Sequence, residues 1–202
     1  MVKYAYRLKK IAQLANGKGK ILDIGFSLLP NPYLKNAIGL DIALPKKKPE
    51  NYEKMIKASI YKMPFKNNSI DTIVLSGVIE HLENPLLALK EVNRILKENG
   101  LILIETPNPY FFPLIISDLI MNLRYYFYDT HISLFPRRMM LKLLWHSGFE
   151  LEKIKGCGMN WNENTTLPLP QQLSQDLIYI ARKRKSMNKY YEKVKKLRKD
   201  NY

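Results

Sequence analysis

The order of hydrophobic and polar positions divides the chain into short apolar runs and longer amphipathic segments. The apolar runs are rich in β-branched residues and end at an acid or a turn-forming residue, which is typical of buried strands. We expect strands at 20–25, 37–41, 55–58, 69–76, 101–105, 149–155 and 176–182. The run at 69–76 is the strongest, because it is uninterrupted and follows the turn-forming pair Asn67-Asn68.

The amphipathic segments repeat apolar residues every three to four positions, which predicts helices. They lie at 4–14, 85–97, 113–126 and 136–146. Asn16-Gly17 and Asn99-Gly100 are predicted to end the first two. Strands that alternate with helices indicate an α/β domain with a doubly wound, mostly parallel sheet covered on both faces. Ligands bind such sheets beyond the carboxyl ends of the strands, so the residues directly after each strand are the candidates for function.

The distribution of charge indicates a second region after this domain. The chain has a formal net charge of +15, and ten of its 33 lysines and arginines lie in residues 182–199. We therefore divide the chain into a domain at 1–185 and a basic, helical tail at 186–202. A solvated helix is the simplest interpretation of the tail, and binding to RNA or to another anionic surface is the alternative.

Cysteine use and hydropathy indicate the cellular compartment of the protein. Cys157 is the single cysteine, which excludes an internal disulfide and fits a reducing cytosol. The first residues lack the apolar run of a signal peptide, and the most apolar stretch, 111–121, is too short to span a bilayer and contains Asp118. We expect a cytoplasmic protein without a transmembrane segment, and no metal site, because Cys157 has no histidine or cysteine at ligand spacing.

Two acids and a glycine mark the ends of the first two predicted strands. The first strand ends in Asp23-Ile24-Gly25, and the second ends in Asp41. A glycine at a strand end allows a tight turn and a close approach to a ligand. An acid after the second strand is suited to a ribose hydroxyl pair, so the pattern indicates a nucleotide-binding crevice. A cap or turn role is the alternative for both acids.

A longer pattern follows, and it is more specific. Its parts are Met63-Pro64-Phe65, Asn68–Asp71, Ser76–Leu82, Glu91-Val92, Arg94–Gly100 and Thr106-Pro107-Asn108. In order, spacing and residue type this pattern resembles the class I S-adenosylmethionine-dependent methyltransferases, most of all their broad small-molecule group. The resemblance runs from Lys20 to about Lys183. It implies a Rossmann-like methyltransferase fold with seven strands, the last of them antiparallel.

The resemblance also implies roles for individual residues. Asp23, Gly25 and Ser27 would lie along the methionine part of S-adenosylmethionine, and Asp41 would hold its ribose. Ser59 and Ile60 would lie at the adenine edge, with serine where many relatives have an acid. Ser76 would line the methyl-transfer crevice. His131, Phe135 and Trp145 fall where relatives have a lid and the helix before the sixth strand, with packing as the simpler role for His131 and Trp145.

The first loop departs from the family pattern. Relatives usually have glycine at the positions of Ser27 and Leu29, and a full helix before the second strand. Pro30 and Pro32 interrupt that stretch, and a long helix cannot fit between Ile24 and Ile38. A bulky Leu29 would narrow the space for the methionine carboxylate.

The expected chemistry demands little of the protein, because the sulfonium is already an activated methyl donor. The chain must align the acceptor, exclude water and remove a proton where necessary. His81, after the fourth strand, is the best-placed base, with a structural role in a short helix as the alternative. The sequence thus predicts methyl transfer to an O or N atom of a small-molecule, glycan or lipid-precursor acceptor.

Two other functions stay open. The net charge favours an RNA methyltransferase, but the Asn-Pro-Pro-Tyr type motif of amino-group enzymes is absent after the fourth strand, where Ser76-Gly77-Val78-Ile79 stands instead. The altered glycine loop favours a non-catalytic, methyltransferase-like binding protein.

Overall fold

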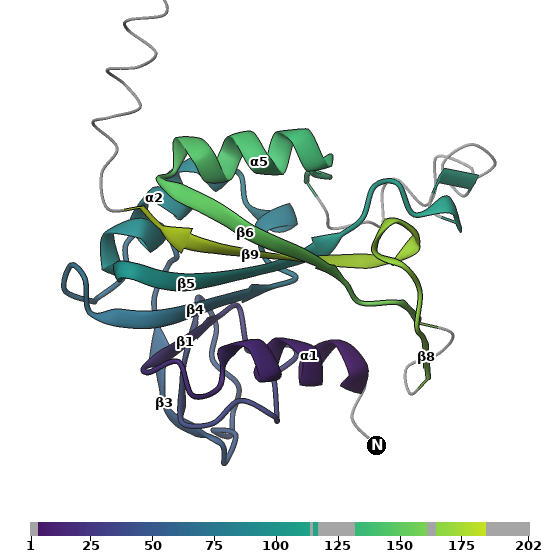
Figure 1. Cartoon of the computed structure of the whole chain (residues 1–202). Helices are drawn as coiled ribbons and strands as arrows, with labels where there is room; N and C mark the ends of the chain where they lie inside the picture. Colours follow the sequence, from purple (N-terminus) through teal and green to yellow (C-terminus); the bar gives the residue numbers. More distant parts are fainter. Residues whose placement is uncertain (1–3, 114, 117–131, 161–164, 185–202) are drawn as a thin grey trace, which may run out of the picture.

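The computed structural model describes residues 4–113, 115–116, 132–160 and 165–184, which form a three-layer α/β domain (Figure 1). Its centre is a seven-stranded sheet in the order β3-β2-β1-β4-β5-β9-β6. Strand β9 runs antiparallel to both of its neighbours, and the other pairs are parallel. The predicted mostly parallel sheet with an antiparallel last strand is therefore confirmed.

All seven predicted strands are present, although several boundaries differ. They are β1 (Ile21–Ile24), β2 (Ala37–Asp41), β3 (Tyr52–Lys57), β4 (Ile70–Ser76), β5 (Leu96–Pro107), β6 (Phe149–Gly156) and β9 (Asp176–Lys183). A short hairpin, β7 (Met159–Asn160) with β8 (Thr166–Leu167), was not predicted. Two-residue strands leave almost no periodic signal in a sequence.

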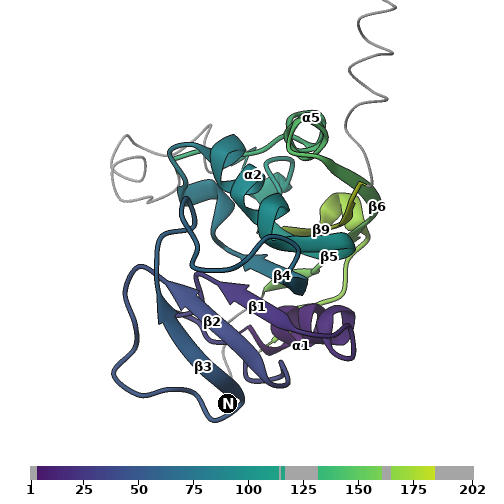
Figure 2. The same ribbon diagram turned by 90° about the vertical axis from the view of Figure 1, so that its left-hand side faces the viewer.

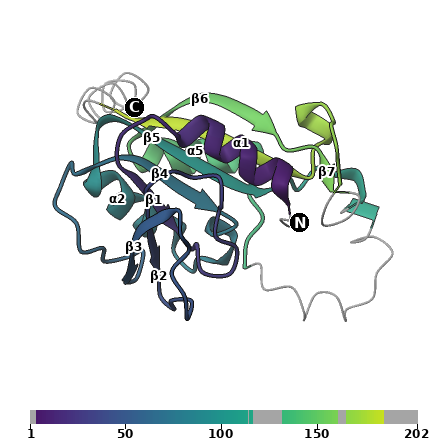
Figure 3. The same ribbon diagram turned by 90° about the horizontal axis from the view of Figure 1, so that it is seen from below.

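Helices cover the two faces unequally. Helix α1 (Ala5–Ala15) packs on one face, over β4 and β5 (Figure 3). Helices α2 (Pro85–Ile95) and α5 (Arg137–His146) pack on the other (Figure 2). The alternation of side chains in β9 separates the two cores: Leu177 and Tyr179 face α2 and α5, whereas Ile178 and Ile180 face α1.

Two boundaries of α2 and β5 correct the prediction. The helix expected at 85–97 ends at Ile95, and Leu96 already pairs with Ile70 in the sheet. Asn99 has φ +60 and lies inside the long strand β5, so Asn99-Gly100 bends a strand rather than ending the helix. Most of the helix predicted at 113–126, and the tail at 186–202, lie outside the described residues.

The half of the sheet formed by β1, β2 and β3 has loops where the other half has helices. Residues 25–36 and 42–51 connect these strands without a helix, as the prolines after Ile24 predict. Asn31 fixes the first loop: its amide donates to the carbonyl of Leu8, and its own N–H donates to the hydroxyl of Tyr52 (3.0 Å). Polar contacts therefore replace helix packing in this region.

Candidate functional site

The carboxyl ends of β1 and β2 meet where the sequence predicts a ligand site. Asp23 pairs with Gly39 and Ile24 with Leu40, and the N–H of Gly25 donates to the carbonyl of Leu40 (2.8 Å). Gly25 has φ +78, a conformation that favours glycine. A Cβ atom at Gly25 would lie 2.3 Å from a methyl group of Val78, so the backbone and this side chain are in close contact.

Asp41 is partly exposed at the end of β2, and its carboxylate organises the neighbouring loops. One oxygen accepts the N–H of Ser27 (3.0 Å), and the other accepts the N–H of Ala43 (3.3 Å). The Ser27 hydroxyl donates to the carbonyl of Ala43. A carboxylate has about four acceptor positions, so each oxygen keeps capacity for a further donor such as a ribose hydroxyl.

Asp23 lies beneath this edge rather than on its surface. Its side chain is buried and accepts a hydrogen bond from the hydroxyl of Tyr52, which also accepts the N–H of Asn31. Burial raises the pKa of Asp23 to about 7, and the nearby charge of Asp41 adds to this effect. The same burial raises the pKa of Tyr52. Asp23 can therefore hold the loop in place, but it does not line a surface.

Phe26 does not obstruct the site. Its ring is buried and stacks on Tyr52 with centroids 5.1 Å apart. A Cβ atom on Gly39 would lie 2.6 Å from this ring, which shows how closely the ring packs on β2. Leu29, the residue expected to narrow the space, is partly exposed.

Ser59 and Ile60 follow β3 and have different surroundings. The Ser59 hydroxyl accepts the N–H of Tyr61 (3.3 Å), so it stabilises its own turn and keeps one proton to donate. The side chain of Ile60 is buried in the core next to α2. Only the backbone of Ile60 is therefore available to a ligand at this edge.

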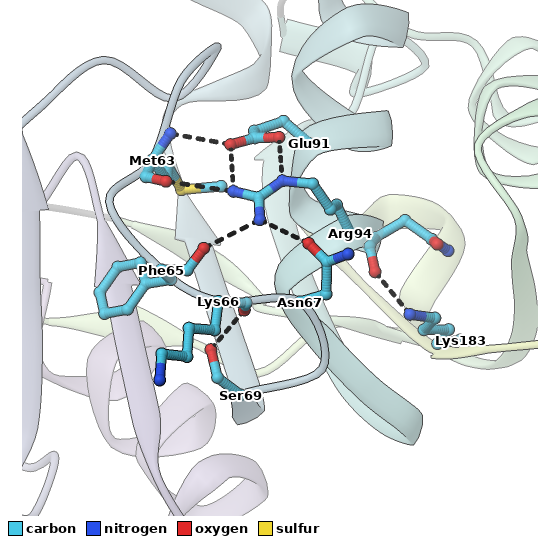
Figure 4. A network of polar contacts seen from close by, with 9 residues as sticks. Met63, Phe65, Lys66, Asn67, Ser69, Glu91, Arg94 and Lys183 are labelled. Atoms are coloured by element: carbon cyan, nitrogen blue, oxygen red, sulfur yellow. Dashed lines mark hydrogen bonds and ion pairs between the residues drawn. The ribbon is translucent and has the colours of Figure 1, made fainter.

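A network around Arg94 fixes the segment that follows Ser59 and Ile60 in the chain (Figure 4). Glu91 accepts the N–H of Met63 (2.8 Å) and pairs with Arg94 (2.7 Å). Arg94 also donates to the carbonyls of Met63 and Phe65. These are the residues of the specific sequence pattern, so much of that pattern describes a scaffold that joins α2 to the turn before β4.

Ser76, at the end of β4, is connected to a buried carboxylate. Its hydroxyl donates to Glu105 (2.7 Å), and the other oxygen of Glu105 accepts from Arg7 of α1 (3.1 Å). Arg7 also lies 3.6 Å from Asp176. Because the single proton of the hydroxyl is committed to Glu105, Ser76 can only accept hydrogen bonds from a ligand.

Glu80 completes this cluster of buried carboxylates, which we call the carboxylate cluster (Glu80, Glu105 and Asp176 with Arg7). The Thr106 hydroxyl donates to Glu80 (3.1 Å), and the Glu80 carbonyl accepts the N–H groups of Ile132 and Ser133. Burial raises the pKa values of Glu80 and Asp176 to about 7. Glu80 is therefore a structural centre that joins the end of β5 to the segment before α5.

The remaining predicted residues lie in different parts of the fold. His81 is exposed at the end of the short helix η1 (Ile79–His81), next to the carboxylate cluster. Phe135 is a core residue, and Trp145 lies at the far end of α5, where Arg184 stacks on its ring. His131 lies outside the described residues.

Sequence reasoning missed three residues of the site: Tyr52, Glu105 and Ile42. Tyr52 and Glu105 act through partners distant in the sequence, and no local pattern announces such contacts. Ile42 could have been found: it directly follows Asp41, and 71% of its surface is exposed. An exposed isoleucine beside a ribose-type acid is suited to the flat face of a base.

The fold and this edge are those of a doubly wound α/β domain, a class of protein in which ligands bind at the carboxyl ends of the strands. A family model described as a methyltransferase domain matches residues 3–154. The chain therefore belongs to the methyltransferase-domain family, and its fold is that of the class I S-adenosylmethionine-dependent methyltransferases.

Individual relatives are similar to part of the chain. An uncharacterized protein of Methanocaldococcus jannaschii is 35% identical over 105 residues, which is 50% of this chain and 41% of that protein. The chain spans less than half the length of this protein and of two further curated relatives.

Solved structures show the same fold. A Haloferax volcanii protein, solved in complex with the methyltransferase activator Trm112, has a TM-score of 0.69 at 12% identity, over 91% of each chain. A Thermotoga maritima S-adenosylmethionine-dependent methyltransferase, described as a possible histamine N-methyltransferase, has a TM-score of 0.64 at 19% identity, over 90% of each chain.

Proposed function

We propose that the chain binds S-adenosylmethionine at the carboxyl ends of β1, β2 and β3 and transfers its methyl group to an O or N atom of a small-molecule, glycan or lipid-precursor acceptor. The geometry of Asp41 carries this proposal. Its two oxygens are fixed by separate backbone N–H groups, so the carboxylate is oriented before any ligand arrives. A preorganised acceptor of this kind binds a hydroxyl pair without first losing conformational entropy.

The other residues at this edge fit the same cofactor. Gly25 carries no side chain at the point where the backbone turns, and Ile42 offers an apolar face next to Asp41. Asp23 and Tyr52 hold the loop from beneath. Val78, in contact with Gly25, would set the width of the space above the glycine. When bound, the cofactor supplies an activated methyl group, and the protein contributes orientation and the exclusion of water.

The bonding of Ser76 favours a methyl acceptor with an N–H or O–H group. Since its hydroxyl donates to Glu105, its lone pairs are what it can offer to an amine or a hydroxyl group. An acceptor nucleus with an N–H or O–H group would thus be oriented through that bond. His81, exposed one residue after the buried Glu80, remains the proposed base.

Calorimetric titration with S-adenosylmethionine and with its demethylated product tests the cofactor. We expect saturable binding, weakened about tenfold or more by Asp41→Asn, because a charge-assisted hydrogen bond contributes about 1.5–3 kcal/mol. Glu50→Gln, at an exposed acid, is the matched control and leaves binding unchanged. Absence of binding to either compound by the parent protein would overturn the proposal.

The net charge of +15 favours one second candidate, an RNA acceptor. Phosphate contacts make RNA binding strongly dependent on salt. A mobility-shift assay at two salt concentrations separates the two candidates: RNA binding that weakens steeply with salt supports the second, and no binding removes it.

A further inference from the structure

The residues that flank the end of β5 and the start of α5 expose an unusual amount of apolar surface. Tyr110, Phe112, Ile132 and Met139 each expose 57–64% of their surface. Large apolar side chains exposed singly are common, but a group of them marks a surface that meets another apolar phase. We call these four residues, with Arg137 and Arg138, the α5 entrance.

Hydrogen bonds bring the two segments of the α5 entrance to one place. Glu80 accepts the Thr106 hydroxyl near the end of β5 and the N–H of Ile132 before α5. Burial raises the pKa of the Tyr179 hydroxyl, and Arg137 and Tyr110 both lie close enough to influence that pKa. Figure 1 shows both segments at the same end of the sheet, where α5 begins.

The charged residues of the α5 entrance are both arginines. Arg137 and Arg138 are exposed in the first turn of α5, and no ion pair of either residue occurs in the part of the chain that the structure describes. Pro136 precedes them, and no side chain caps the helix N-terminus. Two guanidinium groups and a helix N-terminus add their fields at the same point, and all three favour an anion.

Exposed aromatic and aliphatic side chains beside arginines match the interface of an anionic bilayer. There, apolar groups enter the acyl boundary, and arginines meet phosphate groups of lipids. We propose that the α5 entrance docks the domain on the surface of a membrane rich in anionic lipids. Since no helix in the described residues is long and apolar enough to cross a membrane, this contact is interfacial.

Sedimentation with large vesicles tests the docking, using phosphatidylglycerol mixed with phosphatidylcholine and phosphatidylcholine alone. We expect binding to the anionic vesicles only. The double change Arg137→Gln and Arg138→Gln weakens it about tenfold or more, because each arginine near an anionic surface contributes about 1 kcal/mol. The matched control is Lys46→Gln with Lys47→Gln, an exposed pair on the β2–β3 loop that removes the same charge.

A pair of substitutions at apolar residues tests the apolar contribution to membrane docking. Phe112→Ser with Ile132→Ser weakens binding about fivefold even at high salt, whereas Leu28→Ser, at a side chain that is 98% exposed near β1, leaves binding unchanged. Thermal unfolding and calorimetric cofactor binding verify that each variant is folded, which separates this test from that of the proposed function.

Three outcomes would overturn the docking surface. One is equal loss in the arginine and lysine pairs, which would assign binding to net charge alone. Another is no binding of the parent protein to anionic vesicles. The last is a parallel titration with bulk RNA in which the arginine pair loses RNA binding while vesicle binding stays, which would assign the surface to nucleic acid.

Discussion

The two halves of the sheet are built by different means. In the half of β1, β2 and β3, loops replace the connecting helices, and the buried bonds of Asp23, Tyr52 and Asn31 hold the loop after β1. In the half of β4, β5, β9 and β6, helices α2 and α5 cover one face, and the carboxylate cluster lies at the strand ends. The first half depends on buried hydrogen bonds and the second on charge compensation, so the two halves should respond differently to the loss of one side chain.

The largest expected effect belongs to the charged half. Arg7→Met removes the positive partner of Glu105 and Asp176, and leaving a buried charge without its partner costs about 3–5 kcal/mol. Urea denaturation measures this loss. It should be smaller at pH 5 than at pH 8, because the pKa of Asp176 is about 7 and its carboxyl group is largely neutral at pH 5.

Lys9→Met, on the exposed side of α1, is the control and changes the free energy of unfolding by less than about 1 kcal/mol. A loss below about 1 kcal/mol for Arg7→Met would show that the cluster does not depend on this arginine.

Gly25→Ala tests how tightly the first half is packed at its ligand edge. Gly25 and Gly17 have nearly the same φ, +78 and +75, but only Gly25 has a side chain in the way, a methyl group of Val78 at 2.3 Å. Backbone strain costs about 1–2 kcal/mol at both sites, and overpacking adds about 1–3 kcal/mol at Gly25. Thermal unfolding of both variants gives the difference, and equal losses would contradict close packing at Gly25.

Tyr52→Phe removes the buried hydrogen bond between Tyr52 and Asp23 and keeps the shape of the side chain. Asp23 and the N–H of Asn31 each lose a partner, for a cost of about 1–3 kcal/mol in the free energy of unfolding. Calorimetry should also show weaker cofactor binding, because the loop after β1 is held by these bonds. Tyr33→Phe is the control on the same loop. A Tyr52→Phe protein as stable as its parent would disprove the supporting role of this network.

The smallest expected effect concerns the pH dependence of the free energy of unfolding. The pKa of Asp23 rises from 3.8 to about 7 on folding, so the folded state binds the proton more tightly. This group stabilises the fold below about pH 4, and its contribution is lost as pH rises to about 7, with a slope of at most about 1.4 kcal/mol per pH unit. Asp23→Asn removes that slope from urea denaturation curves at pH 5 and pH 6. An unchanged slope would mean that Asp23 is ionised in the fold.

The sequence predicted the sheet well because its signals are local. The run at 69–76 and the Pro85 helix start needed only periodicity and turn chemistry, and both appear where expected. The end of α2 was wrong because sheet pairing of Leu96 with Ile70 overrode the pattern of the helix. Tertiary contacts of this kind are invisible to a window of neighbouring residues.

The site was predictable only in part. Asp41 and Gly25 stand at strand ends, and their spacing alone indicated a shared edge, which the structure contains. Whether Asp23 faces a ligand or the core was decided by Tyr52, 29 positions away. The partner of Ser76 was likewise set by the register of β4 against β5. The role of His81 in catalysis remains a prediction, and so do the roles in cofactor binding of Asp23, Gly25, Ser27, Asp41, Ser59, Ile60 and Ser76.

The salt bridges of Arg7 also bear on the order in which the chain is made and folds. Its partners lie 98 residues away at Glu105 and still further along the chain at Asp176. On a ribosome, the first helix is made long before either acid emerges, and β9 must insert between β5 and β6 to bring Asp176 into place. Contacts that link distant parts of a chain slow folding, so the central sheet can close only after synthesis has passed residue 176.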